Sequence, residues 1–517
     1  MIVTIRLVII SSGAFLFLSG CMVGPNYKRP SAPAPPAFKE PAPPDFKEAE
    51  AQGWKQSQPG DAYAKGKWWE VYNDPGLNAL EEQVSISNQS VLQYEALYRE
   101  AKAVIAQARS ALFPTVGFGP GITVTGTGGA LGGGAGIAAQ PGGASTGTVV
   151  STSSSASTRS IYTLPFSASW EPDIWGNLRR AVTSASANAQ ATAGDLENAK
   201  LLYQSELAQD YFALCGNDQE AALLTRTDAS YKEYLTLTQN RFNGGVASDL
   251  DVAQAESQLY GVESQLIDLG VQRAQYEHAI AVLTGKPPSE VGIPVKTLST
   301  APPAVPVGVP SELLERRPDI AASERRVAAA NEQIGIAIAA FYPSLTLNAS
   351  IGLEASRLAK WFTWPARVWS VGPTLAETLF DAGRRRAIVA EDQAAYDATV
   401  AAYRQTVLTA FQQVEDNLAA LRILENENAK EEQTIQAANR AVTVSTAQYT
   451  AGTVNYLTVI TAQATLLNAQ VSDVTLLTRR YVASVMLVQA LGGGWNSSKL
   501  PSAESVAAAP RSTAGIK

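Results

Sequence analysis

Few residues of this 517-residue chain could carry out chemistry. It contains one histidine, His278, and two cysteines, Cys21 and Cys215. A structural zinc site needs four Cys or His ligands, and general acid–base catalysis most often uses histidine. The chain therefore has too few of these residues for a structural zinc site and almost none for histidine-based catalysis. Charged residues make up 17% of the chain and the net charge is −7, which lacks the basic excess of a nucleic-acid-binding protein. We therefore expect no enzymatic activity, no metal and no cofactor, and we expect Cys215 to be a buried small hydrophobe.

Cys21 is the residue whose context predicts a covalent reaction. Arg6 and the apolar stretch 7–18 form an export signal that is too short to span a bilayer. The signal ends in Leu18-Ser19-Gly20-Cys21, which resembles a bacterial lipobox, so Cys21 is predicted to carry lipid (palmitate among it) as the mature N-terminus. Met22 rather than aspartate follows, which by resemblance to sorted lipoproteins favours the outer membrane. An ordinary signal peptide with a chance cysteine is the alternative.

The elements that would position any site occur twice. The segment Arg241–Val246 returns as Gln448–Thr453, and Leu283-Thr284-Gly285 returns as Ala490-Leu491-Gly492, at one offset (449 − 242 = 207 and 492 − 285 = 207). Phe113-Pro114-Thr115 also returns, as Tyr342-Pro343-Ser344, but at a different offset (342 − 113 = 229). An internal duplication of this kind sets the architecture of a chain before any single residue is considered.

Each copy contains a very long helical stretch. Proline is absent from 173–286 and from 374–500, and both stretches are rich in good helix formers. Each is interrupted once, at Asn243-Gly244-Gly245 and at Ala451-Gly452, which predicts one helix outward and one helix back. From Asn177 to Phe242 a continuous helix would be roughly 98 Å long at about 1.5 Å per residue. Three–four spacing of apolar residues, for example Leu457, Ile460, Ala464, Leu467 and Val471, predicts coiled packing.

Each copy also contains two segments in which apolar and polar residues alternate. They are 122–125 and 164–170 in the first copy, and 345–353 and 369–375 in the second. Period two is typical of a tilted membrane strand, although the hairpin of a soluble sandwich alternates identically. Four strands cannot close a barrel, and an open edge is not tolerated in lipid, so two or three copies are needed. The aromatic residues of the second copy suit an interfacial girdle or a core cluster: Trp361, Phe362, Trp364 and Trp369.

We divide the chain at changes of composition and pattern. The predicted parts are the signal peptide 1–20, the lipidated Pro-rich segment 21–74, the first repeat 75–286, an equatorial linker 287–311, the second repeat 312–494 and a C-terminal tail 495–517. Asp74 followed by Pro75 predicts the start of a helix that runs to Leu112. The Gly/Ser-rich tract 126–160 is predicted to be a loop.

Several motifs resemble those of outer-membrane factors of the TolC/OprM type, in the lipoprotein (NodT-type) branch. The resemblance covers nearly the whole mature chain, in order. It rests on Cys21–Pro30, Trp68-Trp69 with Asp74-Pro75, Glu315–Ile320, Ala330-Asn331 through Tyr342-Pro343, Leu379–Arg384 and Ala490–Trp495. It implies a homotrimer in which four strands per protomer form a membrane β-barrel and long helices form an α-helical, coiled-coil periplasmic tunnel. An α/β equatorial domain would surround the tunnel.

The same resemblance implies the function of an outer-membrane efflux channel. The chain would conduct small molecules such as drugs and toxic compounds passively, and so support multidrug resistance, in a Gram-negative bacterium. Its partners would be a periplasmic adaptor and an inner-membrane transporter of the RND type. The duct of a type I protein-secretion system and a non-conducting structural lipoprotein are the alternatives.

The two interhelical turns are the candidate sites. By resemblance they are the periplasmic tips that dock the adaptor, with Phe242, Gly244, Gly245 and Val246 in the first copy and Tyr449, Gly452 and Thr453 in the second. Glycine at a helical turn is also expected on conformational grounds alone. Family members narrow the tip with aspartates at two positions in the second copy. This chain departs from that pattern, because the two positions are Thr458 and Thr461. Asp251, with Asp249 nearby, occupies the related place of the first copy. Asp249 and Asp251 could form a charged ring or stabilise a helix N-terminus.

Overall fold

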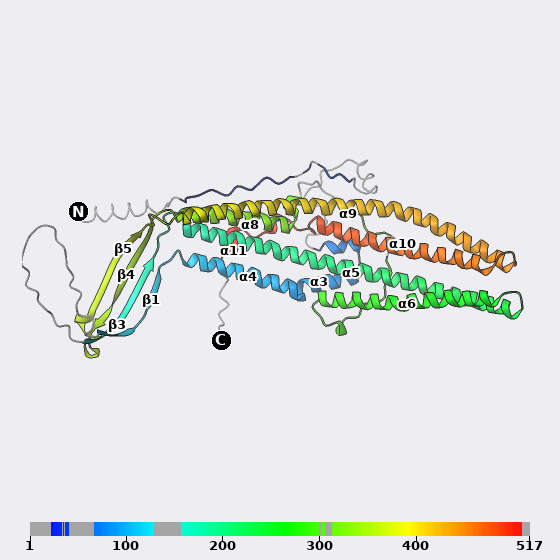
Figure 1. Ribbon diagram of the computed structural model, residues 1–517, viewed down its shortest axis with the longest axis horizontal. Helices are drawn as coiled ribbons and strands as arrows, with labels where there is room; N and C mark the ends of the chain where they lie inside the picture. The colour runs from blue at the N-terminus through cyan, green and yellow to red at the C-terminus, as the bar shows by residue number, and fades with distance from the viewer. Residues whose placement is uncertain are drawn as a thin grey trace, which may run out of the picture. The chain divides into compact units, whose positions relative to one another are not determined.

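The computed structural model describes residues 22–33, 35, 37–40, 67–127, 157–298, 301–305 and 313–508 (Figure 1). The predicted signal peptide, Cys21 and most of the Gly/Ser-rich tract lie outside these residues. The chain forms two compact units, which are described separately. The sheet unit is the described part of Met1–Asn26, Ala106–Val182 and Glu332–Gln393. The helical unit is the described part of Tyr27–Ile105, Thr183–Asn331 and Ala394–Lys517.

The sheet unit contains one antiparallel sheet. Its strands are β1 (Thr115–Phe118), β2 (Gly121–Thr127), β3 (Ser157–Trp170), β4 (Ser344–Ala355) and β5 (Arg367–Ala376). The four predicted segments all lie in these strands, and β1 is an additional one. β1 and β2 pair with opposite ends of β3, β4 pairs with β3, and β5 pairs with β4. Within the described residues β5 and the β1/β2 position are the two edges, so the sheet of one chain is open.

The two faces of this sheet differ in chemistry. The register places Phe166, Ile351 and Trp369 side by side on one face, together with Val371 and other apolar residues. These side chains are exposed, with Ile351 at 65%, Trp369 at 76% and Val371 at 75%. The opposite face carries small polar residues joined across strands. The Ser169 hydroxyl lies 3.0 Å from Asn348 Oδ1, and the hydroxyls of Ser350 and Ser370 are 2.9 Å apart.

The long helices were predicted correctly. Helix α5 (Asn177–Asn243) and helix α9 (Arg384–Thr450) have 67 residues each, and the returning helices α6 (Asp249–Leu283) and α10 (Tyr456–Ala490) have 35 each. Every boundary of the second pair lies 207 positions after its counterpart in the first (384 − 177 = 207 and 490 − 283 = 207). Figure 1 shows α6 returning along α5 and α10 along α9. No helix of the described residues is both long and apolar enough to cross a bilayer.

Short helices connect the long ones. They are η1 (Trp68–Tyr72), α3 (Pro75–Ser87), α4 (Gln89–Ser110), η3 (Pro288–Glu290), α7 (Leu313–Arg316), α8 (Pro318–Ala339), η5 (Leu358–Lys360), η6 (Trp364–Ala366), η7 (Ser497–Lys499) and α11 (Ala503–Ala507). Asp74 caps α3 as predicted, because its Oδ1 accepts the Gly76 amide at 2.9 Å and the Leu77 amide at 3.3 Å.

One predicted helix is two helices. The run from Pro75 to Leu112 breaks at Asn88, whose ψ of 121° is extended, and a new helix begins at Gln89. The physical reason is a side chain with two partners. Asn88 Oδ1 accepts the Val91 amide at 3.0 Å, and Asn88 Nδ2 donates to the Leu283 carbonyl at 2.8 Å. The continuous helix was therefore wrong, since a contact 195 residues away favours the break.

The second repeat makes the matching contact with a different residue. Arg317 Nη1 donates to the Ala490 carbonyl at 3.0 Å. Ala490 is the counterpart of Leu283, and Arg317 follows Asn88 by the same interval that separates the two Phe/Tyr-Pro motifs (317 − 88 = 229 and 342 − 113 = 229). Both hairpins therefore end against the start of a short helix. Gly285 and Gly492 lie at these junctions with φ of +73° and +94°.

Two hydrophobic clusters hold the helical unit together. The larger joins η1, α3, α5, α9 and α10 through buried side chains that include Trp68, Leu77, Leu207, Val407 and Leu487. The smaller joins α5, α6 and α10 through Leu224, Leu259, Val262, Leu467 and Val474. In the smaller cluster, Leu467 and the partly buried Val471 are positions that the three–four spacing predicted. Leu457 is an exception, because it is 51% exposed while Tyr456 and Val459 are buried.

Candidate functional site: the helical tips

Both tips reverse the chain with the same backbone conformation. Gly245 has φ +72° and Gly452 has φ +76°, a region that residues with a side chain rarely adopt. The Val246 amide donates to the Arg241 carbonyl at 2.9 Å, and the Thr453 amide donates to the Gln448 carbonyl at 3.0 Å. The candidate docking residues Phe242, Gly244, Gly245 and Val246 of the first tip and Gly452 and Thr453 of the second are exposed.

Tyr449 differs from the other candidate docking residues. Its side chain is only 4% exposed, and its ring packs against Tyr456 at 5.2 Å between centroids. The guanidinium carbon of Arg241 lies 4.7 Å from the centroid of the Tyr449 ring, and Arg241 Nη1 donates to the Thr450 carbonyl at 3.2 Å. Arg241 lies in the last turn of α5, and Tyr449 lies in the last turn of α9. Arg241 therefore connects the two hairpins at the tip, a role that its place in the sequence did not indicate.

The candidate constriction residues lie in the first turn of α6 and the first two turns of α10. Asp251 belongs to a capping box: its Oδ2 accepts the Ser248 amide at 2.9 Å and its amide donates to Ser248 Oγ at 3.2 Å. Asn455 caps the second helix without a capping box, since its Oδ1 accepts from the Thr458 amide at 3.3 Å and from Thr458 Oγ1 at 2.9 Å. Thr461 Oγ1 donates to the Leu457 carbonyl at 2.9 Å. Asp249 is exposed, and its carboxylate has no partner among the described residues.

A groove follows the second hairpin behind its tip. Its part nearest the tip measures about 480 Å³ and is lined by Ala441, Asn455, Leu457, Thr458, Thr461, Ala462 and Thr465. A second part of about 540 Å³ shares Ala441 and Thr465 and extends to Lys430. In the first hairpin the places of Ala441 and Thr465 are taken by Tyr234 and Gln258 (441 − 234 = 207), which are larger. The groove is therefore a feature in which the two repeats differ.

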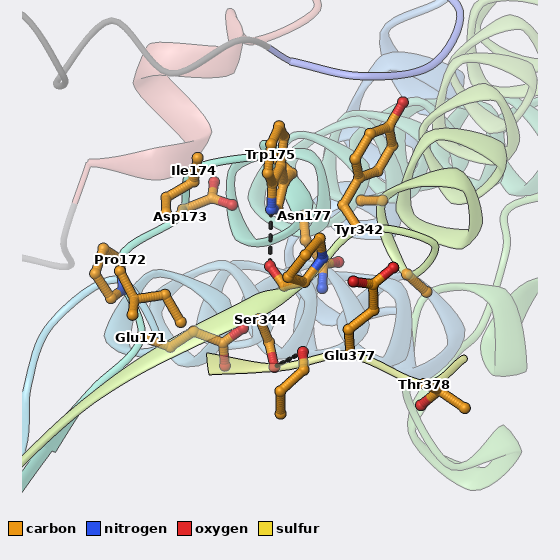
Figure 2. Close-up of a pocket in the computed structure, with 15 residues that line it drawn as sticks. Glu171, Pro172, Asp173, Ile174, Trp175, Asn177, Tyr342, Ser344, Glu377 and Thr378 are labelled. Carbon is orange, nitrogen blue, oxygen red and sulfur yellow. Dashed lines mark hydrogen bonds between the residues drawn. The ribbon is translucent and has the colours of Figure 1, made fainter. Parts of the chain in front are cut away.

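Within the sheet unit, a pocket of about 250 Å³ lies where strands give way to helices (Figure 2). Trp175 stacks on Tyr342 at 4.7 Å between ring centroids, and Trp175 Nε1 donates to the Pro343 carbonyl at 2.8 Å. Asp173 accepts from the Arg179 amide at 2.8 Å and from Arg179 Nε at 3.0 Å. These contacts fix the turn between β3 and α5 against the turn between α8 and β4. The residues that line this pocket therefore hold two turns together.

Perturbed carboxylates are scattered through the helical unit. Burial alone would raise the pKa of Asp74, but hydrogen bonds from Lys296 and Tyr211 and from the Leu77 amide lower it overall. Burial raises the pKa of Glu81 well above its usual value, since no partner among the described residues offsets it. Burial, with repulsion from Glu206, raises the pKa of Asp210 to about 6. None of these three carboxyl groups lines the groove behind the second tip or the pocket of the sheet unit.

Comparison with known proteins identifies this arrangement. The family model described as "Outer membrane efflux protein" matches residues 80–286 and 309–493. The pyoverdine export outer membrane protein OpmQ of Pseudomonas putida is 31% identical over 454 residues, covering 86% of this chain and 92% of OpmQ. Outer membrane protein OprJ of Pseudomonas aeruginosa is 29% identical over 490 residues, covering 94% of this chain and 95% of OprJ. The solved outer-membrane channel OprN is 27% identical with a TM-score of 0.79, over 92% of this chain and 100% of that one.

Proposed function

The chain belongs to the outer membrane efflux protein family, and on that premise we propose that it is the outer-membrane duct of a tripartite efflux system, which lets small molecules out passively. The observation that carries the proposal is the two-faced sheet. An exposed apolar face continues across every strand, while serine, threonine and asparagine occupy the other face. A membrane barrel with a wet interior requires this alternation.

Closure of the barrel requires further copies of the chain. Unpaired backbone groups at the two edges of the sheet would each cost several kcal/mol (about the cost of an unsatisfied peptide group) in the hydrocarbon. The sheet is four strand positions wide, because β1 and β2 share one position beside β3. Three copies would supply twelve positions. We therefore propose a homotrimer in which β5 of one protomer pairs with the β1/β2 position of the next.

The N-terminal segment supports a lipid tether at the helix-bearing end of the sheet. The Val23 amide donates to the Trp175 carbonyl at 3.2 Å, and Arg180 Nε donates to the Val23 carbonyl at 2.8 Å. Gly176, with φ +84°, lies against Met22. The residues after Cys21 are thus held where β3 turns into α5. A lipid on Cys21 would enter the leaflet on that side, which in an outer-membrane lipoprotein is the periplasmic one.

We propose that a periplasmic adaptor docks at the tips and in the groove behind the second tip. Exposed glycine and small side chains there would allow another helix to approach closely. An RND-type inner-membrane transporter would deliver the substrate. Curated relatives are named for pyoverdine export and for efflux of toluene and antibiotics, so we propose small organic molecules as the cargo.

Planar-bilayer recording of the purified mature protein tests the proposal. We expect discrete conductance steps that rise when the tip contacts are removed. A protein that inserts into the bilayer but never conducts, even with Arg241 and Tyr449 both replaced by alanine, would instead indicate a structural lipoprotein. Copurification of a transporter and an adaptor of an efflux system, rather than of a protein-secretion system, would identify the partners.

A further inference from the structure

The loop between β4 and β5 concentrates positive charge at the end of the sheet that is farthest along the strands from the helices. Residues 355–367 contain three cations, Arg357, Lys360 and Arg367, and no carboxylate. The other connection at this end, 128–156, contains no charged residue at all. The nearest carboxylate is Glu354, which the register places opposite Thr163 on the polar face of the sheet. We call Arg357, Lys360 and Arg367, with Phe362 and Trp364, the rim cluster.

The rim cluster is built on an ordered loop. Two short turns, η5 and η6, are closed by backbone hydrogen bonds, such as that from the Lys360 amide to the Arg357 carbonyl at 3.0 Å. Thr363 Oγ1 donates to the Lys360 carbonyl at 2.7 Å, and Ala366 is buried beneath the loop. Trp361 packs on Tyr162 of β3 at 5.6 Å between ring centroids. The loop therefore holds its cations at fixed places.

No carboxylate of the described residues neutralises the cations of the rim cluster. Arg357, Lys360 and Arg367 are exposed, and none makes an ion pair with the described residues. Arg367 stacks on Trp364, with its guanidinium carbon 3.2 Å from the ring centroid, and its Nε donates to the Trp364 carbonyl at 3.2 Å. This fixes the plane of the guanidinium and leaves both Nη groups for an external acceptor. A planar fork of this kind suits phosphate.

The rim cluster also continues the apolar face. Along β5 that face reads Leu375, Pro373, Val371, Trp369 and then Arg367, so hydrocarbon-type residues give way to an indole and then to a cation. Phe362 and Trp364, at 70% and 74% exposure, extend the aromatic part into the loop. An apolar band that ends in aromatic rings and arginine matches a bilayer that ends in phosphate headgroups.

We propose that the rim cluster binds the phosphate groups of the phosphorylated glycolipid (lipid A type) in the outer leaflet. This rests on the proposed function only for the placement of the sheet in the outer membrane. The proposed lipid on Cys21 would place the helix-bearing end at the periplasmic leaflet, so the rim cluster would face the other leaflet. Three separated cations fit a sugar headgroup bearing two phosphates better than a single-phosphate lipid, and the exposed Trp364 ring offers a face on which a sugar can stack.

The test measures binding of the purified full-length mature protein to lipid A in mixed micelles by calorimetry. The probes are bisphosphorylated lipid A, lipid A stripped of phosphate, and phosphatidylglycerol. We expect the wild-type protein to prefer bisphosphorylated lipid A over the other two by at least about tenfold. In the variant R357Q/K360Q/R367Q the affinity for it should fall about a hundredfold, because each cation near an anionic lipid surface adds a several-fold preference.

A matched control removes three cations elsewhere. In R99Q/K102Q/R159Q the net charge changes equally, and Arg159 is near the same end of the sheet but, paired with Thr125, on its polar face. This control should bind lipid A like the wild type. Circular dichroism should be normal in both variants, and single-channel conductance should be normal in R357Q/K360Q/R367Q. If the triple variant does not fold, the test uses two other measurements. They are the affinity of R367Q for bisphosphorylated lipid A, which should be lower than that of the wild type, and the preference of the wild type among the three lipids.

Two outcomes would overturn the proposal. One is a folded triple variant that binds lipid A as tightly as the wild type. The other is a wild-type protein that binds phosphate-free lipid A or phosphatidylglycerol equally well. Conductance in the same preparations tests the proposed function separately, since a protein that binds lipid A through these residues but does not conduct contradicts the duct and supports the rim cluster.

Discussion

At the scale of single residues, Arg241 and Tyr449 connect two hairpins that are also joined near the tip by apolar packing and by the hydroxyls of Tyr234 and Thr446, 3.4 Å apart. The guanidinium lies over the ring and also donates to the Thr450 carbonyl. A partly desolvated cation–π contact contributes about 0.5–2 kcal/mol, enough to bias a closed tip several-fold. We expect Arg241→Ala to raise single-channel conductance or open probability several-fold in a planar bilayer.

Lys232→Ala is the control for the Arg241 prediction. Lys232 is a cation of the same helix, but it pairs with Asp228 at 2.9 Å and Glu263 at 3.2 Å, both within the first hairpin. Its loss should leave conductance unchanged. Equal conductance of Arg241→Ala and the wild type would show that the contact between hairpins does not restrain the tip.

Glu81 is a buried carboxyl without a partner, and its pKa is raised by burial. The folded protein therefore retains a proton that the unfolded chain has lost once the pH exceeds the ordinary glutamate pKa. Stability is fully present below that ordinary value and falls as the pH rises toward the folded-state pKa. Glu81→Gln should be more stable than the wild type at pH 8, by about 1–3 kcal/mol, and nearly unchanged at pH 5.

The measurement for Glu81 is the difference in thermal unfolding midpoint between pH 5 and pH 8. Glu82→Gln is the matched control, since Glu82 is exposed and pairs with Lys67 at 2.5 Å. It should retain the pH dependence of the wild type. A Glu81→Gln variant with the same pH dependence as the wild type would contradict a protonated Glu81.

At the scale of elements, the chain on either side of helix α10 depends on glycine for two separable reasons. Gly492 and Gly452 both have positive φ, at +94° and +76°. A β-carbon on Gly492 would collide with the Arg316 carbonyl oxygen, whereas one on Gly452 would meet open space. Gly452→Ala should therefore cost only the backbone term, about 1 kcal/mol, and Gly492→Ala should cost several kcal/mol.

Thermal unfolding of the two alanine variants by circular dichroism checks the glycine prediction, and Gly285→Ala is expected to behave like Gly492→Ala because it faces the Ser87 carbonyl. Equal midpoints for Gly452→Ala and Gly492→Ala would mean that the packing of α10 against the start of α8 contributes little. The repeat would then be held by the hydrophobic clusters alone.

At the scale of the whole molecule, the open sheet predicts where one copy must meet another. In the proposed trimer the amides of β5 and of β1/β2 gain partners across the interface, so their hydrogen exchange should be slow. In a dissociated monomer they should exchange at least about a hundredfold faster, since an unpaired edge has no protection. β4 is the internal control, because it is paired on both sides within one chain and stays protected.

Hydrogen exchange followed by mass spectrometry, on protein before and after dissociation of its oligomer, gives this comparison. Rapid exchange of β5 in the assembled protein would exclude a barrel closed through that edge. A molar mass three times that of the mature chain is the accompanying expectation.

The sequence alone determined the features that depend on neighbours along the chain. Residues adjacent in the sequence are enough to predict four features, because helices and strands have fixed periods. These features are the 207-residue repeat, the length of α5 and α9, the cap at Asp74 and the alternation of the strands. The family followed from motifs spread in order over the chain. Near the tip the three–four spacing correctly predicted that Ile460 is buried, but Leu457 is exposed and Tyr456 is buried.

Only the tertiary structure decided what joins distant residues. The break at Asn88 depends on the Leu283 carbonyl, and Arg241 meets Tyr449 across 208 positions (449 − 241 = 208). The face on which the loop cations lie follows from pairing between β4 and β5. Such contacts depend on how whole elements pack. A local pattern of residue types does not show which distant residue will be its partner.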